Sequence, residues 1–112
     1  MKLEYFPIHG RAIQIRLLLA YCKVDYEDIF VTFPEFAQRK KQGDFSPSGQ
    51  LPMLTLDDGT KLFQTKSILR YIAKTQKGKN GENLYPGHSD PLLSFKIDEV
   101  IDTREDFLNN NL

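Results

Sequence analysis

The sequence predicts an α/β fold in which a mixed four-stranded sheet is followed by a purely helical segment. Within about the first 30 residues the apolar pattern changes from strand-like to helical spacing and back again. A second pair of strand-like runs is joined by an Asp-Gly turn. Beyond residue 90 the apolar spacing is helical only.

The first part of the chain predicts a strand, a helix and a second strand. Lys2–Phe6 has strand composition, and residues 11–22 carry apolar side chains at helical spacing. Tyr26–Phe33 is aromatic and β-branched, as strands are. Such βαβ units are right-handed with parallel strands in nearly all proteins, so we expect the sheet to begin parallel.

The middle of the chain predicts a short exposed helix over 34–42 and a mobile loop over Gly43–Gln50, which is rich in Gly and Ser. Leu51–Leu56 and Lys61–Phe63 flank the Asp-Gly turn and predict an antiparallel hairpin. Thr65 is positioned to cap the next helix. The buried stripe of that helix is expected to be Ile68, Leu69 and Ile72.

These patterns divide the chain into residues 1–78 with the sheet, residues 79–90 with linker composition, and residues 91–112 with no strand signal. Asp90 and Pro91 predict a helix start, and helical spacing continues to about residue 108. One side of this helix is apolar and is expected to face a core, with Leu93, Ile97, Val100, Ile101, Phe107 and Leu108. The other side is acidic and suits solvent or a positive partner, with Asp98, Asp102, Glu105 and Asp106.

Composition excludes several classes of function. Fifteen Lys plus Arg balance fifteen Asp plus Glu, so the chain has no net charge with which to attract nucleic acid. The longest apolar run, Leu17–Cys22, is far shorter than the roughly 20 residues of a membrane span. A single cysteine and two histidines exclude zinc sites and Cys-x-x-Cys redox centres. We therefore expect a soluble, cytoplasmic protein.

Four motifs in the correct order resemble the cytosolic glutathione transferases of the tyrosine-using classes, sigma, alpha, mu and pi. They are Leu3–Phe6 with Gly10–Ala12, Gly49–Pro52, Phe63–Thr65 with Ile68–Ala73, and Ile97–Thr103. The resemblance spans nearly the whole chain. It implies a thioredoxin-like first domain, glutathione as co-substrate, and a linker to an all-α domain whose first helix would be residues 91–112.

The resemblance implies that Tyr5 is the catalytic tyrosine and that Arg11 supports the thiolate. A phenol stays protonated at neutral pH and can donate a hydrogen bond to a thiolate nucleophile. The alternatives are a packed strand tyrosine and an arginine in a surface ion pair. His9 stands where many relatives carry arginine, and Ile13 where many carry an acid, which predicts weaker support for the thiolate.

The same resemblance assigns the glutathione-binding residues. Leu51–Pro52 would be a cis-proline step whose backbone pairs with the cysteinyl unit, with Gln50 beside it. Gln64 and Thr65 would hold the γ-glutamyl group, since a hydroxyl and backbone N–H groups at a helix start suit a carboxylate. The alternatives are an ordinary trans proline at a strand start and a plain helix cap.

The glycyl end of glutathione has less certain partners in this sequence. Phe33 stands where sigma-like relatives carry tryptophan, and it lacks the indole N–H that would bind the glycyl carboxylate. Arg39, Lys40 or Lys41 would be the candidate cation, although a solvated helix face is the commoner role of such residues.

The acids of the last predicted helix align with the dimer interface of the family. Asp106 would face the glutathione amine bound to the neighbouring subunit. Oxygen ligands at Asp102, Glu105 and Asp106 would also suit magnesium or calcium, although acids at this spacing more often form a solvated helix face. Ser48 replaces the aromatic dimer key of alpha, mu and pi relatives, which favours a more polar, sigma-like homodimer.

The sequence thus predicts a glutathione transferase that activates the glutathione thiol for conjugation to a small electrophile, or for its isomerisation or reduction. The alternative is a noncatalytic subunit of the same fold that serves as an interaction module in a larger assembly. The electrophile is unspecified, because in this family its site is lined largely by later helices. The apolar face of 91–108 predicts that the chain is a fragment of a longer protein or is bound to another subunit.

Overall fold

The computed structural model describes residues 1–109 and confirms the predicted order of elements. These are β1 (Lys2–Tyr5), the 3₁₀ turn η1 (Gly10–Ala12), α1 (Ile13–Tyr21), β2 (Glu27–Phe30), α2 (Phe33–Lys41), β3 (Met53–Thr55), β4 (Lys61–Phe63), α3 (Thr65–Thr75), the 3₁₀ turn η2 (Gly87–Ser89) and α4 (Pro91–Leu108). The end of the predicted segment 91–112 lies outside the described residues. Within residues 1–109 no helix is both long and apolar enough to cross a membrane.

The predicted second strand is too long at its C-terminal end. The strand stops at Phe30, and Phe33 is already the first residue of α2. The side chain of Thr32 accepts a hydrogen bond from the backbone N–H of Glu35 at 3.3 Å, which caps α2 and ends the extended backbone.

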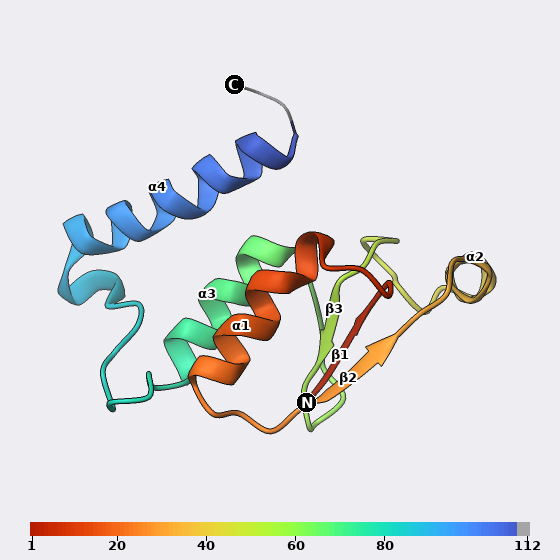
Figure 1. Cartoon of the computed structure of the whole chain (residues 1–112), viewed down its shortest axis with the longest axis horizontal. Helices are drawn as coiled ribbons and strands as arrows, with labels where there is room; N and C mark the ends of the chain where they lie inside the picture. The colour runs from red at the N-terminus through yellow and green to blue at the C-terminus, as the bar shows by residue number, and fades with distance from the viewer. Residues whose placement is uncertain (110–112) are drawn as a thin grey trace.

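The four strands form one mixed sheet in the order β2-β1-β3-β4. The pair β1 and β2 is parallel, whereas β3 runs antiparallel to both β1 and β4. In Figure 1, α1 and α3 lie side by side next to the sheet, and α2 lies beyond β2, away from both helices. The predicted mixed four-stranded sheet is therefore confirmed.

Two groups of buried side chains pack the sheet against the neighbouring helices and loops. The first group joins strands β1 and β3 to helices α1 and α3, and consists of Leu3, Ile15, Leu19, Leu54, Ile68 and Ile72. The second group lies at the end of β1, and consists of Tyr5, Ala12, Val31, Phe45, Leu51 and Met53. Because Tyr5 and Leu51 belong to the second group, the core itself positions two predicted site residues.

The predicted mobile loop Gly43–Gln50 contains an anchor that its composition does not indicate. Phe45 is only 1% exposed and stacks on Phe36 of α2, with ring centroids 5.3 Å apart. The guanidinium of Arg39 lies 4.9 Å above the same ring. The loop is thus packed between α2 and the sheet.

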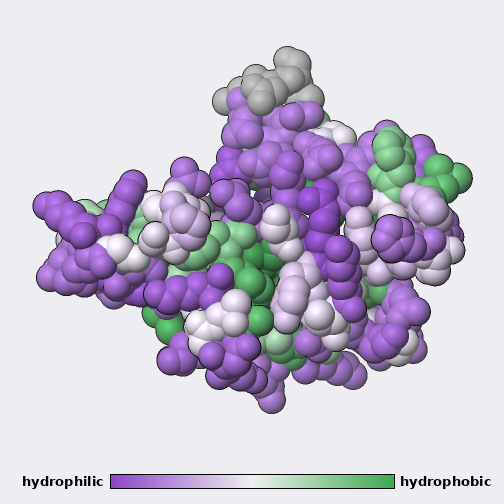
Figure 2. All heavy atoms as spheres, turned by 180° about the vertical axis from the view of Figure 1, so that it is seen from behind, coloured by the Kyte–Doolittle hydropathy of each residue, from purple (hydrophilic) through white to green (hydrophobic). Residues whose placement is uncertain are grey.

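Helix α4 docks on the rest of the protein with its acidic side. Asp98 pairs with Arg70 of α3 at 2.8 Å, and Asp102 pairs with Lys66 at 3.1 Å. Its apolar side, which the sequence predicts to face a core, faces outward instead, and Val100 is 70% exposed. From behind, the surface is mostly hydrophilic, with hydrophobic residues gathered in the middle of the molecule (Figure 2).

Candidate glutathione-binding site

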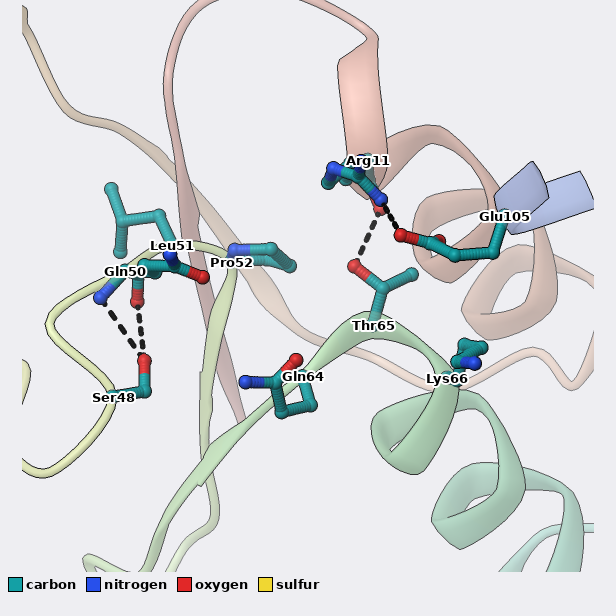
Figure 3. Close-up of a pocket in the computed structure, with 9 residues that line it drawn as sticks. All are labelled: Arg11, Ser48, Gln50, Leu51, Pro52, Gln64, Thr65, Lys66 and Glu105. Carbon is teal, nitrogen blue, oxygen red and sulfur yellow. Dashed lines mark hydrogen bonds and ion pairs between the residues drawn. The ribbon is translucent and has the colours of Figure 1, made fainter. Parts of the chain in front are cut away.

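A cavity of about 260 Å³ opens where the start of the first helical region, the loop before β3 and the start of α3 meet. It is lined by Arg11, Ser48, Gln50, Leu51, Pro52, Gln64, Thr65, Lys66 and Glu105 (Figure 3). Six of these are residues that the sequence assigned to the site, namely Arg11, Gln50, Leu51, Pro52, Gln64 and Thr65. Folding thus brings together three segments that are distant along the chain.

Tyr5 lies at the end of β1, adjacent to this cavity, and is 6% exposed. Its hydroxyl oxygen accepts a hydrogen bond from the backbone N–H of Arg11 at 3.1 Å. A phenol oxygen that accepts from the backbone keeps its own O–H proton for a second partner. The arrangement therefore presents an oriented O–H donor.

Gly10 allows this close approach of backbone and phenol. Its φ is +43°, and a Cβ atom at this position would lie 2.4 Å from the Tyr5 hydroxyl oxygen. Any other residue would displace the ring or the turn. The Gly10-Arg11 step thus fixes the hydroxyl of Tyr5.

Arg11 joins three parts of the protein. Its guanidinium pairs with the carboxylate of Glu105 on α4 and donates to the side-chain oxygen of Asn109 at 2.7 Å. Its backbone carbonyl accepts a hydrogen bond from the Thr65 hydroxyl at 3.2 Å. Arg11 is therefore held from both α3 and α4, and its fixed positive charge stays beside the cavity (Figure 3).

The predicted cap at Thr65 is wrong. Thr65 is the first residue of α3, and its hydroxyl bonds Arg11 rather than the N–H groups of its own helix. Gln64 occupies the cap position, and its side chain makes no capping hydrogen bond. With the Gln64 side chain uncommitted to the cap, its amide can be used in the cavity.

Gln64 also has an unusual backbone conformation. Its φ is +75°, a region that residues other than glycine seldom adopt. Such conformations cost roughly 1–3 kcal/mol and concentrate at functional sites. The conformation places Gln64 at the edge of the cavity immediately before α3 (Figure 3).

The loop before β3 supplies the opposite wall of the cavity. The Leu51–Pro52 bond is cis, as predicted, and Ser46–Pro47 is a second cis bond that was not predicted. The Ser48 hydroxyl accepts from the backbone N–H of Gln50 at 3.0 Å, which closes the turn before Leu51.

Three predicted site residues, Tyr5, Phe33 and Asp106, are not among the residues that line the cavity of their own chain. Phe33 is 63% exposed and stacks on Phe6, with ring centroids 4.6 Å apart. Asp106 is exposed on α4. Its predicted role concerns a neighbouring subunit, so it stays a prediction.

The three candidate cations of α2 differ in their surroundings. Arg39 pairs with Glu4 at 2.6 Å and with Asp44 at 3.0 Å, and the Glu4 carboxylate raises the pKa of its guanidinium. Lys40 instead runs alongside the loop, where its ε-carbon would lie 3.4 Å from a Cβ atom on Gly49. Lys40 is thus the α2 cation that approaches the loop segment next to Gln50.

Sequence reasoning missed two charged residues of the cavity wall. Lys66 directly follows the predicted binding pair Gln64-Thr65 in the sequence, and this position could have indicated that it lines the cavity. Glu105 was assigned to an interface or cation site, whereas it faces the chain's own cavity. Among residues 1–109 no group of three or more His, Cys, Asp or Glu side chains is arranged to hold a metal ion.

A βαβ and ββα order around a mixed four-stranded sheet, with a cis proline at a polar cavity, defines a thioredoxin-like domain. Residues 1–74 match the family model described as "Glutathione S-transferase, N-terminal domain". The chain belongs to the glutathione S-transferase family.

Individual relatives agree with this assignment. The chain is 34% identical over 109 residues to probable glutathione S-transferase 6 of Caenorhabditis elegans, a match covering 97% of this chain and 47% of the relative. It is 31% identical to human hematopoietic prostaglandin D synthase, covering 96% and 48% of the two chains. The crystal structure of monomeric Na-GST-3, a glutathione S-transferase of the hookworm Necator americanus, superposes with a TM-score of 0.76 at 33% identity, covering 96% and 47%. The chain thus spans about half the length of the curated relatives it matches.

Proposed function

We propose that this protein binds glutathione and activates its thiol for attack on an electrophile, as a glutathione transferase. The observation that carries the proposal is the hydroxyl of Tyr5, which is anchored by the Arg11 N–H at 3.1 Å while its own proton stays available. Family membership and the polar cavity beside this hydroxyl support the same function.

In this proposal glutathione lies along the cavity with its γ-glutamyl end at the start of α3. Gln64 and Thr65 hold the γ-glutamyl carboxylate, because the first N–H groups of a helix favour an anion. The backbone of Leu51 pairs with the cysteinyl unit, and Gln50 and Pro52 shape that wall. The glycyl end points toward α2, where Phe33 offers an apolar edge and Lys40 a cation.

Tyr5 acts on the sulfur. The thiol proton is lost to solvent, and the Tyr5 O–H donates a hydrogen bond to the thiolate that remains. Each unit by which the thiol pKa falls requires about 1.4 kcal/mol of preferential binding to the anion. A charge-assisted hydrogen bond together with the positive charge of Arg11 can supply roughly 2 units.

The bound thiolate attacks an electrophilic carbon and forms a carbon–sulfur bond. The displaced electron pair goes to a leaving group or, in an addition, to a conjugated acceptor that takes up a proton. The proposal includes isomerisation or reduction of an electrophile as well as conjugation. We place the protein in the cytoplasm, as a homodimer or a larger assembly formed through α4.

Calorimetry with glutathione tests the site assignment. Gln64→Ala should weaken binding by roughly 1–3 kcal/mol, because a charged group of the ligand loses a hydrogen-bond partner. Gln76→Ala removes a matched amide at the other end of α3 and should leave the affinity unchanged. A folded protein that binds no glutathione, or binds it equally after Gln64→Ala, would disprove the assignment.

The second candidate function is a noncatalytic interaction module of the same fold. It is favoured by the departures at His9, Ile13, Phe33 and Ser48 and by the exposed apolar side of α4. In that case glutathione would bind without any fall in its thiol pKa. The two functions are therefore separated by the titration of the bound thiol.

A further inference from the structure

We propose that Glu4 and Arg39 form a positioning pair, which holds helix α2 and its contacts with the glycyl end of the ligand against the sheet. The inference rests on the proposed function, in which the glycyl end of glutathione points toward α2. Both residues act through the placement of this helix and do not line the cavity.

Helix α2 has few buried side chains with which to keep its position. Among the described residues 33–41 none is fully buried, and Phe36 and Arg39 are the two that are partly buried. Phe36 packs on Phe6 and Phe45, with ring centroids 5.1 and 5.3 Å apart. The helix lies beyond β2, away from α1 and α3 (Figure 1). Arg39 is therefore one of the two partly buried anchors of α2.

The partner of this anchor is a buried acid in the middle of the sheet. Glu4 lies on β1, between β2 and β3, and is only 8% exposed. Side chains alternate along a strand, so Glu4 points to the face opposite Leu3, which packs on α1 and α3. A buried carboxylate needs a partner, and the Arg39 guanidinium supplies one at 2.6 Å. The pair ties α2 to the strand that also carries Tyr5.

Arg39 extends this connection to the loop before β3. Its Nε donates a hydrogen bond to the Asp44 carboxylate at 3.0 Å, and its guanidinium carbon lies 4.9 Å from the ring centroid of Phe45. Later residues of the same loop, Gln50 and Leu51, line the cavity. A planar guanidinium can bond carboxylates and stack on a ring, whereas an ammonium group is a point charge. Strand β1, helix α2 and the loop thus meet at one side chain.

This arrangement leaves Lys40 as the cation of α2 that lies beside the loop. Its Nζ would lie 3.9 Å from a Cβ atom on Gly49. Because Arg39 is committed to acids of the protein, Lys40 is the candidate partner of the glycyl carboxylate in the proposed function. The distance from Lys40 to the rest of the site depends on where α2 lies. Loss of the Glu4–Arg39 pair should therefore cost affinity at the glycyl end of the ligand.

The test compares glutathione with γ-glutamylcysteine, which is the same ligand without its glycyl unit. Glu4→Gln keeps the shape of the side chain but removes the charge that holds Arg39. It should weaken glutathione binding about tenfold, the size expected for one lost charge-assisted contact, and leave binding of γ-glutamylcysteine unchanged. Glu4→Asp keeps the charge and should retain part of the glycyl contribution. Glu27→Gln is the matched control, since Glu27 is exposed on the neighbouring strand β2.

A double variant keeps the test decisive if Glu4→Gln does not fold. Glu4→Met together with Arg39→Met replaces both charges of the pair by apolar side chains, so neither charge is left buried without its partner. This variant should fold and should show the same selective loss of glutathione affinity.

Calorimetry of both ligands, with hydrogen exchange of the α2 amides, separates the outcomes. The inference expects faster exchange in α2, a selective loss for glutathione and an unchanged pKa of the bound thiol. If the unsubstituted protein binds neither ligand, the proposed function fails as well. If it binds both equally well, α2 contributes nothing to the glycyl end and the inference is overturned. If Glu4→Gln weakens both ligands equally, or neither, the pair serves only the fold, which also overturns the inference.

Discussion

The sheet-containing part of the protein and helix α4 are held in place by different forces. Residues of β1, β3, α1 and α3 meet in a core whose members are completely buried, such as Leu3 and Leu54. Helix α4 instead docks through carboxylates on Lys66, Arg70 and Arg11, and much of its apolar surface stays exposed. Apolar burial dominates folding energy, whereas half-exposed ion pairs contribute little.

The two parts also differ in how far residues of the same part account for their packing. The sheet-containing part buries its apolar core residues against one another. Helix α4 also has an apolar side, on which Leu92 and Val100 are exposed. The ion pairs therefore explain the packing of only one of its two sides. The cavity lies where both parts meet, since Glu105 comes from α4 and the other lining residues come from 1–78.

The largest expected effect comes from the core. Leu54→Ala should lower the free energy of unfolding by about 2–5 kcal/mol, because it leaves a cavity beneath α1 and α3. Leu92→Ala, the same change at a residue that is 69% exposed on α4, should alter it by less than about 0.5 kcal/mol. Urea unfolding followed by circular dichroism measures both. Equal losses would contradict the contrast between the two parts.

A smaller effect of opposite sign is expected at Gln64. Gln64→Gly should stabilise the fold by roughly 1 kcal/mol by relieving the positive φ, and should weaken glutathione binding by removing the amide. Lys23→Gly is the control, since Lys23 also has a positive φ of 55° but lies outside the cavity. It should stabilise the fold without changing affinity. If both changes destabilise, the backbone at these positions is not strained.

The smallest effect concerns the docking of α4. The hydrogen bond from Arg70 holds the pKa of the Asp98 carboxyl below its usual value, so the pair stabilises docking fully above about pH 4. This contribution, roughly 0.2–1 kcal/mol, is lost as the pH falls through the lowered pKa. Carboxyl NMR titration with amide hydrogen exchange of α4 measures it.

Arg70→Gln supplies the control for that titration. The pKa of Asp98 should rise toward its usual value in this variant. Asp58, whose pKa is lowered by Thr60 in the β3–β4 turn, should titrate as before. A pKa of Asp98 that does not respond to Arg70→Gln would mean that the pair does not hold α4.

Pattern alone predicts the elements because each has its own periodicity and end signals. It fails where the environment of a single side chain differs from what the composition of its segment suggests. Phe45 is buried although Gly, Ser and Pro surround it, because the approach of α2 creates its pocket. Thr65 bonds Arg11 instead of its own helix, which depends on how two distant segments meet.

The site residues likewise divide into those that the sequence predicted and those that it did not. The cis bond at Leu51–Pro52 and the convergence of Arg11 and Gln64 agree with the family motifs. Glu105 could not be assigned to the cavity, because the rotation of α4 is set by its pairs with α3 rather than by its own pattern. The domain boundary at residues 79–90 and the role of Asp106 stay predictions.

The most direct test of thiol activation is the ultraviolet absorbance of bound glutathione thiolate against pH in Tyr5→Phe. The substitution removes the O–H donor with almost no change in volume, so affinity should persist while the thiol pKa rises by about 1–2 units. Tyr71→Phe, a matched change on the outer side of α3, should titrate like the unsubstituted protein. Identical curves for Tyr5→Phe and the unsubstituted protein would show that Tyr5 only packs, and would contradict the proposed mechanism.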